Sequence, residues 1–248
     1  MLLDEMKNVK FMNRVDTKYL FPVTKLQPLL LNISDDYRIL EIDHLREFSY
    51  KTIYFDTPEY FFFKQHVTGK LSRFKVRVRT YETNGLTFLE VKHKSNKGRT
   101  SKTRIKRDNG DQYDDQKSQN FLQELISVDA QLLKPVITTG FTRITLVNIS
   151  SSERITLDYN LSYNNLKGNR TELPFLAIAE IKRDKSVGHS QFVQQIKKLG
   201  IHQTGFSKYC VGMALLYDVP KQNNLKPKLL LLNKIKDEYY RNGFASGQ

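Results

Sequence analysis

The sequence predicts an α+β fold in which an antiparallel eight-stranded β-barrel, shaped as a tunnel, is flanked by helices. Three observations lead to this prediction. Eight segments alternate between polar and apolar residues in the manner of strands. Helical signals lie between and after them without a regular strand–helix alternation, which argues against a parallel, doubly wound sheet. Eight strands are also enough to close a small barrel.

The strands are predicted from a two-residue period, which sends successive side chains to opposite faces. The predicted strands cover residues 14–21, 49–56, 71–81, 86–94, 100–107, 136–148, 154–161 and 175–182.

The helices are predicted from apolar residues at helical spacing and from capping residues. Thr24 and Gln27 resemble a capping box, and Ser190 is a candidate N-cap. The predicted helices cover residues 24–33, 121–126, 191–199, 208–217 and 229–240. The aromatic stretch PEYFFFKQH at 58–66 is interpreted as core or as a helix face. We expect one domain at 1–218, followed by a helical tail at 219–248.

The composition indicates a folded, strongly basic protein. The 248 residues include 40 Lys and Arg against 26 Asp and Glu, a net charge of +14. This excess favours an anionic partner, such as nucleic acid, a membrane surface or a polyphosphorylated ligand. Cys210 is the single cysteine, so no intrachain disulfide forms. Without a signal peptide or a long apolar run, the chain is expected in the cytoplasm.

Cations share one face of several predicted strands. In FKVRVRTY at 74–81, Lys75, Arg77 and Arg79 alternate with valines, and Arg73 has the same parity. In an ordinary antiparallel sheet such a face is simply the solvated one. If the apolar faces instead pack outward against helices, the cations line a basic tunnel, and something anionic is expected to face them.

Three acids share these polar faces: Glu90, Asp158 and Glu180. Carboxylates among phosphate-binding cations suit a hard divalent cation, which prefers oxygen ligands. The alternative is that they pair with neighbouring Arg and Lys, and both interpretations stay open for Glu90 and Asp158.

A series of short motifs resembles one family, the triphosphate tunnel metalloenzymes, and within it the VTC-type polyphosphate polymerase domain. The motifs are RVDTKYLF at 14–21, YFDT at 54–57, KVRVRTY at 75–81, FLEVKHK at 88–94, FTR at 141–143, ERITLD at 153–158, IAEIKRD at 178–184 and FSKYC at 206–210.

The resemblance implies an enzyme that binds ATP with Mn²⁺ or Mg²⁺ and transfers the terminal phosphate of ATP to a growing inorganic polyphosphate chain. The implied catalytic residues are Arg77, Arg79, Lys92, Arg143 and Arg154. The substrate-binding candidates are Lys18, Lys102, Arg104, Phe141, Lys182 and Lys208, with the orientation of Lys102 and Arg104 left open. Glu180 matches the family's metal-binding glutamate, and Glu90 and Asp158 are the further candidate metal ligands from the charge pattern.

The first strand departs from part of this family. Hydrolase and adenylyl cyclase relatives begin with Glu-x-Glu-x-Lys, whereas this chain has Arg14, Asp16 and Lys18. This difference favours the polymerase branch and leaves the metal site more dependent on Glu180. The alternatives are a metal-dependent triphosphatase or nucleotidyl cyclase of the same fold, a non-catalytic polyphosphate binder, and a nucleic-acid-binding module. DNA is not an expected partner, and coupling to transport would need a separate membrane partner.

Overall fold

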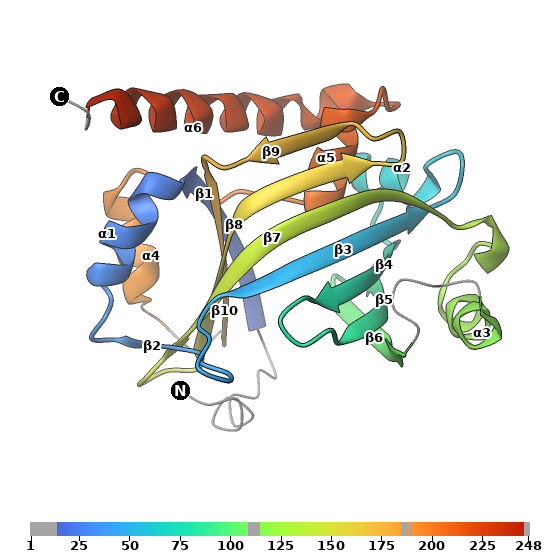
Figure 1. Ribbon diagram of the computed structural model, residues 1–248, viewed down its shortest axis with the longest axis horizontal. Coiled ribbons are helices and arrows are strands. Elements are labelled where there is room, and N and C mark those ends of the chain that lie inside the picture. The colour runs from blue at the N-terminus through green and yellow to red at the C-terminus, as the bar shows by residue number, and fades with distance from the viewer. Residues whose placement is uncertain (1–13, 109–114, 185–187, 189, 246–248) are drawn as a thin grey trace.

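The computed structural model describes residues 14–108, 115–184, 188 and 190–245. Over these residues the chain forms one antiparallel sheet of ten strands with helices around it (Figure 1). The main path runs in spatial order through β1 (Arg14–Pro22), β10 (Leu176–Asp184), β8 (Glu153–Asn165), β7 (Lys134–Asn148), β3 (Phe48–Asp56), β4 (Arg73–Tyr81), β5 (Thr87–Lys94) and β6 (Thr100–Arg107). Two short strands lie off this path: β2 (Tyr37–Ile39) pairs with β7, and β9 (Arg170–Leu173) pairs with β8.

Each of the eight predicted strands is confirmed and lies on the main path. The sequence did not predict β2 and β9, because three and four residues are too few to show an alternation. The sheet is curled, but within the described ranges β1 and β6 do not pair with each other, so hydrogen bonds do not close the barrel. β6 has largely exposed side chains, including Lys102 and Lys106, and lysines on an edge strand oppose further pairing.

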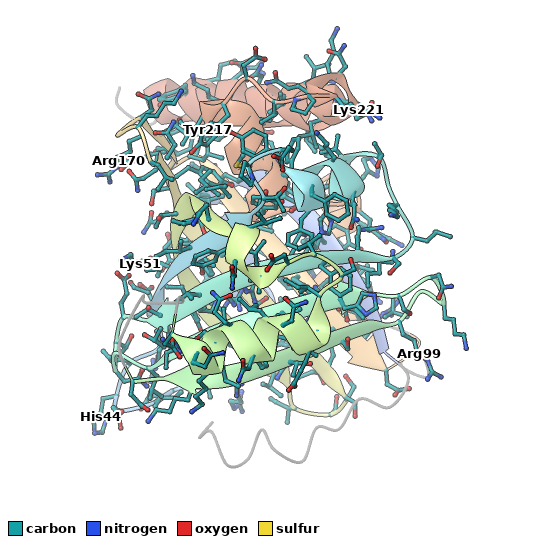
Figure 2. The ribbon with its side chains drawn as sticks, turned by 90° about the vertical axis from the view of Figure 1, so that its right-hand side faces the viewer. His44, Lys51, Arg99, Arg170, Tyr217 and Lys221 are labelled. Atoms are coloured by element: carbon teal, nitrogen blue, oxygen red, sulfur yellow. The ribbon has the colours of Figure 1, made fainter. Side chains whose placement is uncertain are left out.

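The apolar strand faces point outward, toward helices. One cluster joins α1 (Leu26–Leu31) and α4 (Gln191–Lys198) to β1, β10, β8 and β7. A second cluster joins α3 (Gln116–Leu125) and the start of α2 (Phe61–Val67) to Val76 and Val78 of β4 and to Leu89 and Val91 of β5. In Figure 2, α3 crosses in front of these strands. Because the valines of β4 are buried outside, the cations between them face inward.

Two further helices pack on the remaining apolar cluster. α5 (Lys208–Leu216) packs on β7 and β8 and buries Tyr209 and Met213 among residues of the inner sheet face, such as Tyr54. α6 (Lys226–Ala245) runs along the top of Figure 1 and contributes Leu232 and Ile235 to the same cluster. In the described part of the chain, no helix combines the length and apolar character needed to cross a membrane. The division into a domain and a tail at residue 218 stays a prediction.

The helix predictions are confirmed in position, with one capping error. Ser190 caps α4, because its Oγ accepts a hydrogen bond from the Val193 backbone N at 3.1 Å. The capping box at Thr24 is wrong: α1 begins at Leu26 after Lys25, without a side-chain cap. Short 3₁₀ turns complete the fold: η2 (Val23–Lys25), η3 (Ala130–Leu132) and η4 (Gln222–Leu225).

Candidate active site

The strand register turns the alternating cations of β4 into one wall of the tunnel. Across the β4–β5 ladder, Lys75 lies opposite Lys92 and Arg77 lies opposite Glu90. In the next ladder Lys102 of β6 lies opposite Lys92. Directly opposed residues of an antiparallel pair project to the same face. The wall formed by β4, β5 and β6 is therefore lined mainly by cations.

The facing wall comes from β1, β10, β8 and β7. Lys18 lies opposite Glu180, and Lys182 lies opposite Arg154. Charges on the two walls interact across the interior, since Lys18 and Glu180 both influence the pKa of Lys92. The curl of the sheet therefore brings predicted site residues from both ends of the strand path into one interior space.

Arg143, Asp158 and Lys208 form a buried ion triad at the junction of β7, β8 and α5. The Arg143 guanidinium donates through Nε to Asp158 Oδ1 at 2.6 Å and through Nη2 to Oδ2 at 2.8 Å. Lys208 donates to the same Oδ2. Burial alone would raise the pKa of Asp158, but Arg143 and Lys208 hold this pKa well below its usual range. The triad fixes two cations toward the tunnel interior.

An aromatic pair lies beside this triad. Tyr50 and Phe141 stack with ring centroids 5.0 Å apart and an interplanar angle of 5°. Arg143 lies 5.3 Å from both ring centroids, and Arg79 lies at 5.5 and 5.6 Å. Arg79 also donates from Nε to Thr52 Oγ1 at 3.2 Å. The two guanidinium groups are thus positioned by ring faces as well as by polar contacts.

Glu90 is paired on the basic wall. Its carboxylate, 1% exposed, accepts from Arg77 Nη2 at 2.6 Å and from Lys102 Nζ at 3.1 Å. Burial works to raise the pKa of Glu90, but Arg77, Arg79 and Lys102 together outweigh it, and the pKa falls to about 2. Arg104 has the same parity as Lys102 and lies 4.4 Å from the ring centroid of Phe88. Both candidates therefore lie on the tunnel face, and which of them binds substrate stays a prediction.

Glu180 occupies the middle of the facing wall. It accepts from Lys182 Nζ at 2.7 Å and lies 3.1 Å from Lys18 Nζ. Lys182 also donates to Asp16 Oδ2 at 3.1 Å, so one ammonium lies between two carboxylates. Burial alone would raise the pKa of Glu180, but Lys18 and Lys182 hold it well below its usual range.

The carboxylates differ in how well they fit a divalent metal. In the described ranges, no three Asp, Glu, His or Cys side chains are grouped as metal ligands. The ion pairs of Glu90 and Asp158 favour the pairing alternative for these two residues. Glu180 fits better, with Asp16 close by, because Mg²⁺ is commonly held by one or two carboxylates together with substrate phosphates. The metal roles of all three predicted acids stay predictions.

Three inward cations lack a carboxylate partner within the described structure: Arg79, Lys75 and Lys92. Burial and the charge of Arg77 lower the pKa of Arg79 to about 10. Burial lowers the pKa of Lys75 to about 8, and burial together with Lys75 lowers that of Lys92 to about 8. Burial is the main cause of each lowered pKa and neighbouring cations add to it, and a bound polyanion would favour the charged forms.

A buried hydrogen-bond cluster holds α5 in place behind the triad. Asp56, fully buried, accepts from the backbone N of Phe62 and of Phe63, both at 2.8 Å. Its Oδ2 also accepts from the Tyr209 hydroxyl. Asp56 thereby joins the start of α2 to α5, and Tyr209 adjoins Lys208. The motifs YFDT and FSKYC contained these residues, but the sequence did not show that they meet.

The structure brings the predicted site residues of the strands to one face of the sheet, and α5 adds Lys208 through its contact with Asp158. Sequence reasoning missed Tyr50 and Thr52, although their parity within the strand at 49–56 was a usable signal. It also placed Lys75 on the basic face without selecting it as a site residue. The roles of all these residues in binding and catalysis stay predictions.

An antiparallel curled sheet with inward cations and outward helices defines a triphosphate tunnel fold. The VTC domain matches residues 13–217. The chain therefore belongs to the VTC domain family. A search of curated protein sequences returned no match.

Solved structures are similar to this chain at low sequence identity. A candidate adenylate cyclase from Bacillus halodurans is 16% identical, with a TM-score of 0.51 over 79% of this chain and 94% of that chain. A candidate adenylate cyclase from Vibrio parahaemolyticus is 13% identical, with a TM-score of 0.47 over 80% and 96%. The candidate adenylyl cyclase HpAC1 from Hippeastrum, described as having a dominant triphosphatase activity, is 15% identical, with a TM-score of 0.47 over 85% and 99%.

Proposed function

We propose that this VTC domain protein is an ATP-dependent polyphosphate polymerase, which transfers the terminal phosphate of ATP to a growing inorganic polyphosphate chain in the tunnel. The observation that carries the proposal is the inward row of cations without carboxylate partners in the described structure: Arg79, Lys75 and Lys92. Such a row suits a linear polyanion better than a compact one. The family match supports the same substrate class.

The region around the aromatic pair suits the triphosphate of ATP. Arg79, Arg143 and Lys208 converge there, with Lys208 Nζ 4.3 Å from the Phe141 ring centroid. Arginine binds phosphate oxygens with a planar pair of donors and stays protonated, and lysine adds a compact charge. These groups would hold the donor phosphates in line with the acceptor.

The phosphoryl transfer needs no covalent intermediate with the protein, because the phosphate chain is itself the nucleophile. A terminal phosphate oxygen of the chain attacks the γ-phosphorus of ATP, the bond to the β-phosphate oxygen breaks, and ADP leaves. The basic walls align the two reactants and stabilise the charge on the phosphoryl oxygens. Glu180, with Asp16 nearby, would hold Mn²⁺ or Mg²⁺, which neutralises phosphate charge when bound.

The test is product analysis after incubation of the purified protein with ATP and Mn²⁺. We expect a ladder of long polyphosphate on a stained polyacrylamide gel and little free phosphate. Arg79→Gln is the sharpest variant, because Arg79 has no carboxylate partner in the described structure and its loss leaves no unpaired buried acid. Loss of one such donor is expected to slow synthesis about 100-fold or more. Arg170→Gln, at an exposed ion pair on β9, is the matched control.

Two other outcomes would replace the proposal. Free phosphate without polymer would indicate the triphosphatase alternative, which the two carboxylates around Lys182 favour. Absence of any ATP turnover, together with binding of polyphosphate or RNA, would indicate a binding module. The proposed location is the cytoplasm, with a separate membrane partner only if synthesis is coupled to transport.

A further inference from the structure

The first two residues of α5 contact different parts of the sheet. Lys208 donates to Asp158 of β8, whereas the Tyr209 hydroxyl donates to Asp56 at the end of β3. In the sheet, β7 lies between β8 and β3. The start of α5 thus bridges two strands that do not pair with each other, and these two contacts together orient the start of the helix.

Asp56 is a fixed anchor for the Tyr209 hydroxyl. Its side chain is fully buried, and its Oδ1 accepts from the backbone N of Thr57 and of Phe62, both at 2.8 Å. Its Oδ2 accepts from the backbone N of Phe63 at 2.8 Å and from Tyr209. Burial raises the pKa of Asp56, and the hydrogen bond from Tyr209 makes the largest opposing contribution. Because backbone donors hold both oxygens, the acceptor offered to Tyr209 has little freedom to move.

The ring of Tyr209 packs independently of its hydroxyl. It stacks on Tyr54 with ring centroids 5.1 Å apart and meets Phe63 edge-on at 6.2 Å. Tyr54 lies opposite Arg77 in the β3–β4 ladder, and their side chains form a hydrogen bond. Tyr209→Phe would therefore keep the ring contacts and lose the bond to Asp56.

The segment before α5 leaves the position of Lys208 to the helix itself. Residues 201–207 are irregular backbone that contacts β1 at Gln203 and Thr204. At Gly205 an added Cβ would meet no atom within 4 Å, so the chain is not closely packed there. From Gly205 onward, the position of the chain therefore depends on the contacts of α5 and its N-cap, Ser207.

We infer that Tyr209, anchored by Asp56, is a positioning residue for phosphoryl transfer, because its hydroxyl fixes the start of α5 and with it the Lys208 ammonium. The inference rests on the proposed function for the reaction with ATP, although it does not depend on the acceptor. Lys208 Nζ lies 4.3 Å from the Phe141 ring centroid, where the donor phosphates are proposed to bind. A displacement of about 1 Å in such a group can slow a reaction about 100-fold.

The first test is the rate of ATP turnover by Tyr209→Phe. We expect kcat to fall about tenfold and the KM for ATP to change less than about threefold. The reason is that Arg79 and Arg143 still bind the donor phosphates while Lys208 is displaced. Asp56→Asn, which removes the acceptor instead of the donor, is the second variant and should lower kcat at least as much. A wild-type kcat in either variant would overturn the positioning role.

The matched control is Tyr217→Phe. Tyr217 follows the last residue of α5, and its hydroxyl donates to the Val136 backbone O (Figure 2). Tyr217→Phe and Tyr209→Phe each remove a tyrosine hydrogen bond that anchors α5, so both should lower the urea midpoint. Tyr217→Phe should nevertheless keep the wild-type kcat, because Lys208 lies at the other end of the helix. An equal loss of kcat in both variants would show a general loosening of α5 and overturn the inference.

A double-mutant cycle tests whether Tyr209 acts through Lys208. Lys208→Gln removes the ammonium and leaves Asp158 paired with Arg143. We expect Lys208→Gln to lower kcat about 100-fold. Adding Tyr209→Phe should change this loss little, since no ammonium remains to be positioned. Independent losses would instead multiply to about 1,000-fold. That result, or an unchanged kcat in Lys208→Gln, would overturn the positioning role.

Measuring total ATP turnover together with its products separates this inference from the proposed function. If the wild-type protein releases free phosphate without polymer and the cycle still couples Tyr209 to Lys208, the polymerase proposal fails and the positioning role stands. If the wild-type protein makes polymer while the two losses are independent, the positioning role alone fails. A wild-type protein that does not turn over ATP overturns both.

Discussion

The buried carboxylate of Asp158, 4% exposed, holds both Arg143 and Lys208 in the tunnel. We expect Asp158→Asn to lower the free energy of unfolding by about 3–5 kcal/mol, because two buried cations lose their counter-charge. Urea unfolding at neutral pH measures this loss. Glu172→Gln, at the exposed pair with Arg170, should change it by less than about 1 kcal/mol. Equal effects of the two variants would contradict the role assigned to the triad.

Asp158 should also make the free energy of unfolding depend on pH. Burial opposes ionisation of Asp158, but Arg143 and Lys208 outweigh it and the folded-state pKa is lowered. The stabilisation is therefore present above the unfolded-state pKa of about 3.9 and is lost as the pH falls toward the folded-state value. The wild-type protein should lose this part of its stability in acid, and Asp158→Asn should not.

Lys75 should give polymer binding a dependence on alkaline pH. Its pKa is lowered to about 8, so its charge is lost as the pH rises from about 7 to about 9. The groups facing it are Arg73, Arg77, Lys18, Lys92, His66 and Cys210. We expect long-chain polyphosphate to bind more weakly at about pH 9, measured by anisotropy. In Lys75→Arg the charge persists, and a decline as steep as in the wild type would contradict the assignment to Lys75.

At the scale of elements, α5 packs on β7 and β8 so closely that Gly212 leaves no room for a side chain. An added Cβ would lie 2.6 Å from Tyr163 Cε1 and 2.7 Å from Ile137 Cδ1. Alanine favours a helix over glycine by about 1 kcal/mol, but overpacking costs about 1–3 kcal/mol. We therefore expect Gly212→Ala to lower the urea midpoint. Gly205→Ala, where a Cβ would meet nothing within 4 Å, should leave it nearly unchanged.

The elements also show what the sequence could and could not predict. The alternation in segments such as 71–81 was sufficient to predict the long strands and their polar faces, because strand parity is a local property. The ion pairs between neighbouring strands could not be predicted from this alternation. That Glu90 pairs with Arg77, and Asp158 with Arg143, depends on register between strands. Non-local contacts such as Asp56 with Tyr209 join segments far apart in the chain and leave no local pattern.

On the scale of the whole molecule, the cation-bearing side of the sheet is turned inward with α5 packed on part of it, and the opposite, apolar side is covered by other helices. This arrangement collects cations from strands across the whole path in one interior space, while α1, α4 and α3 cover the outward clusters. The parity of single strands could not decide between a solvated face and a tunnel, because both give the same alternation. The sequence also predicted helices that could cover the apolar faces and enough strands to curl the sheet. These two features favoured a tunnel over a solvated face.

Removal of the C-terminal helix α6 would test whether the folded unit ends at residue 218. Leu232 and Ile235 of α6 are 3% and 4% exposed in the cluster shared with the sheet, and Glu238 lies 2.6 Å from Lys25. Burying each apolar side chain contributes about 1.5–3 kcal/mol, so a chain ending at residue 218 should unfold at a lower urea concentration than the full chain. Lys234→Ala, an exposed change on the same helix, is the control. An unchanged midpoint after truncation would instead support a folded unit that is complete at residue 218, with the remainder as an appended tail.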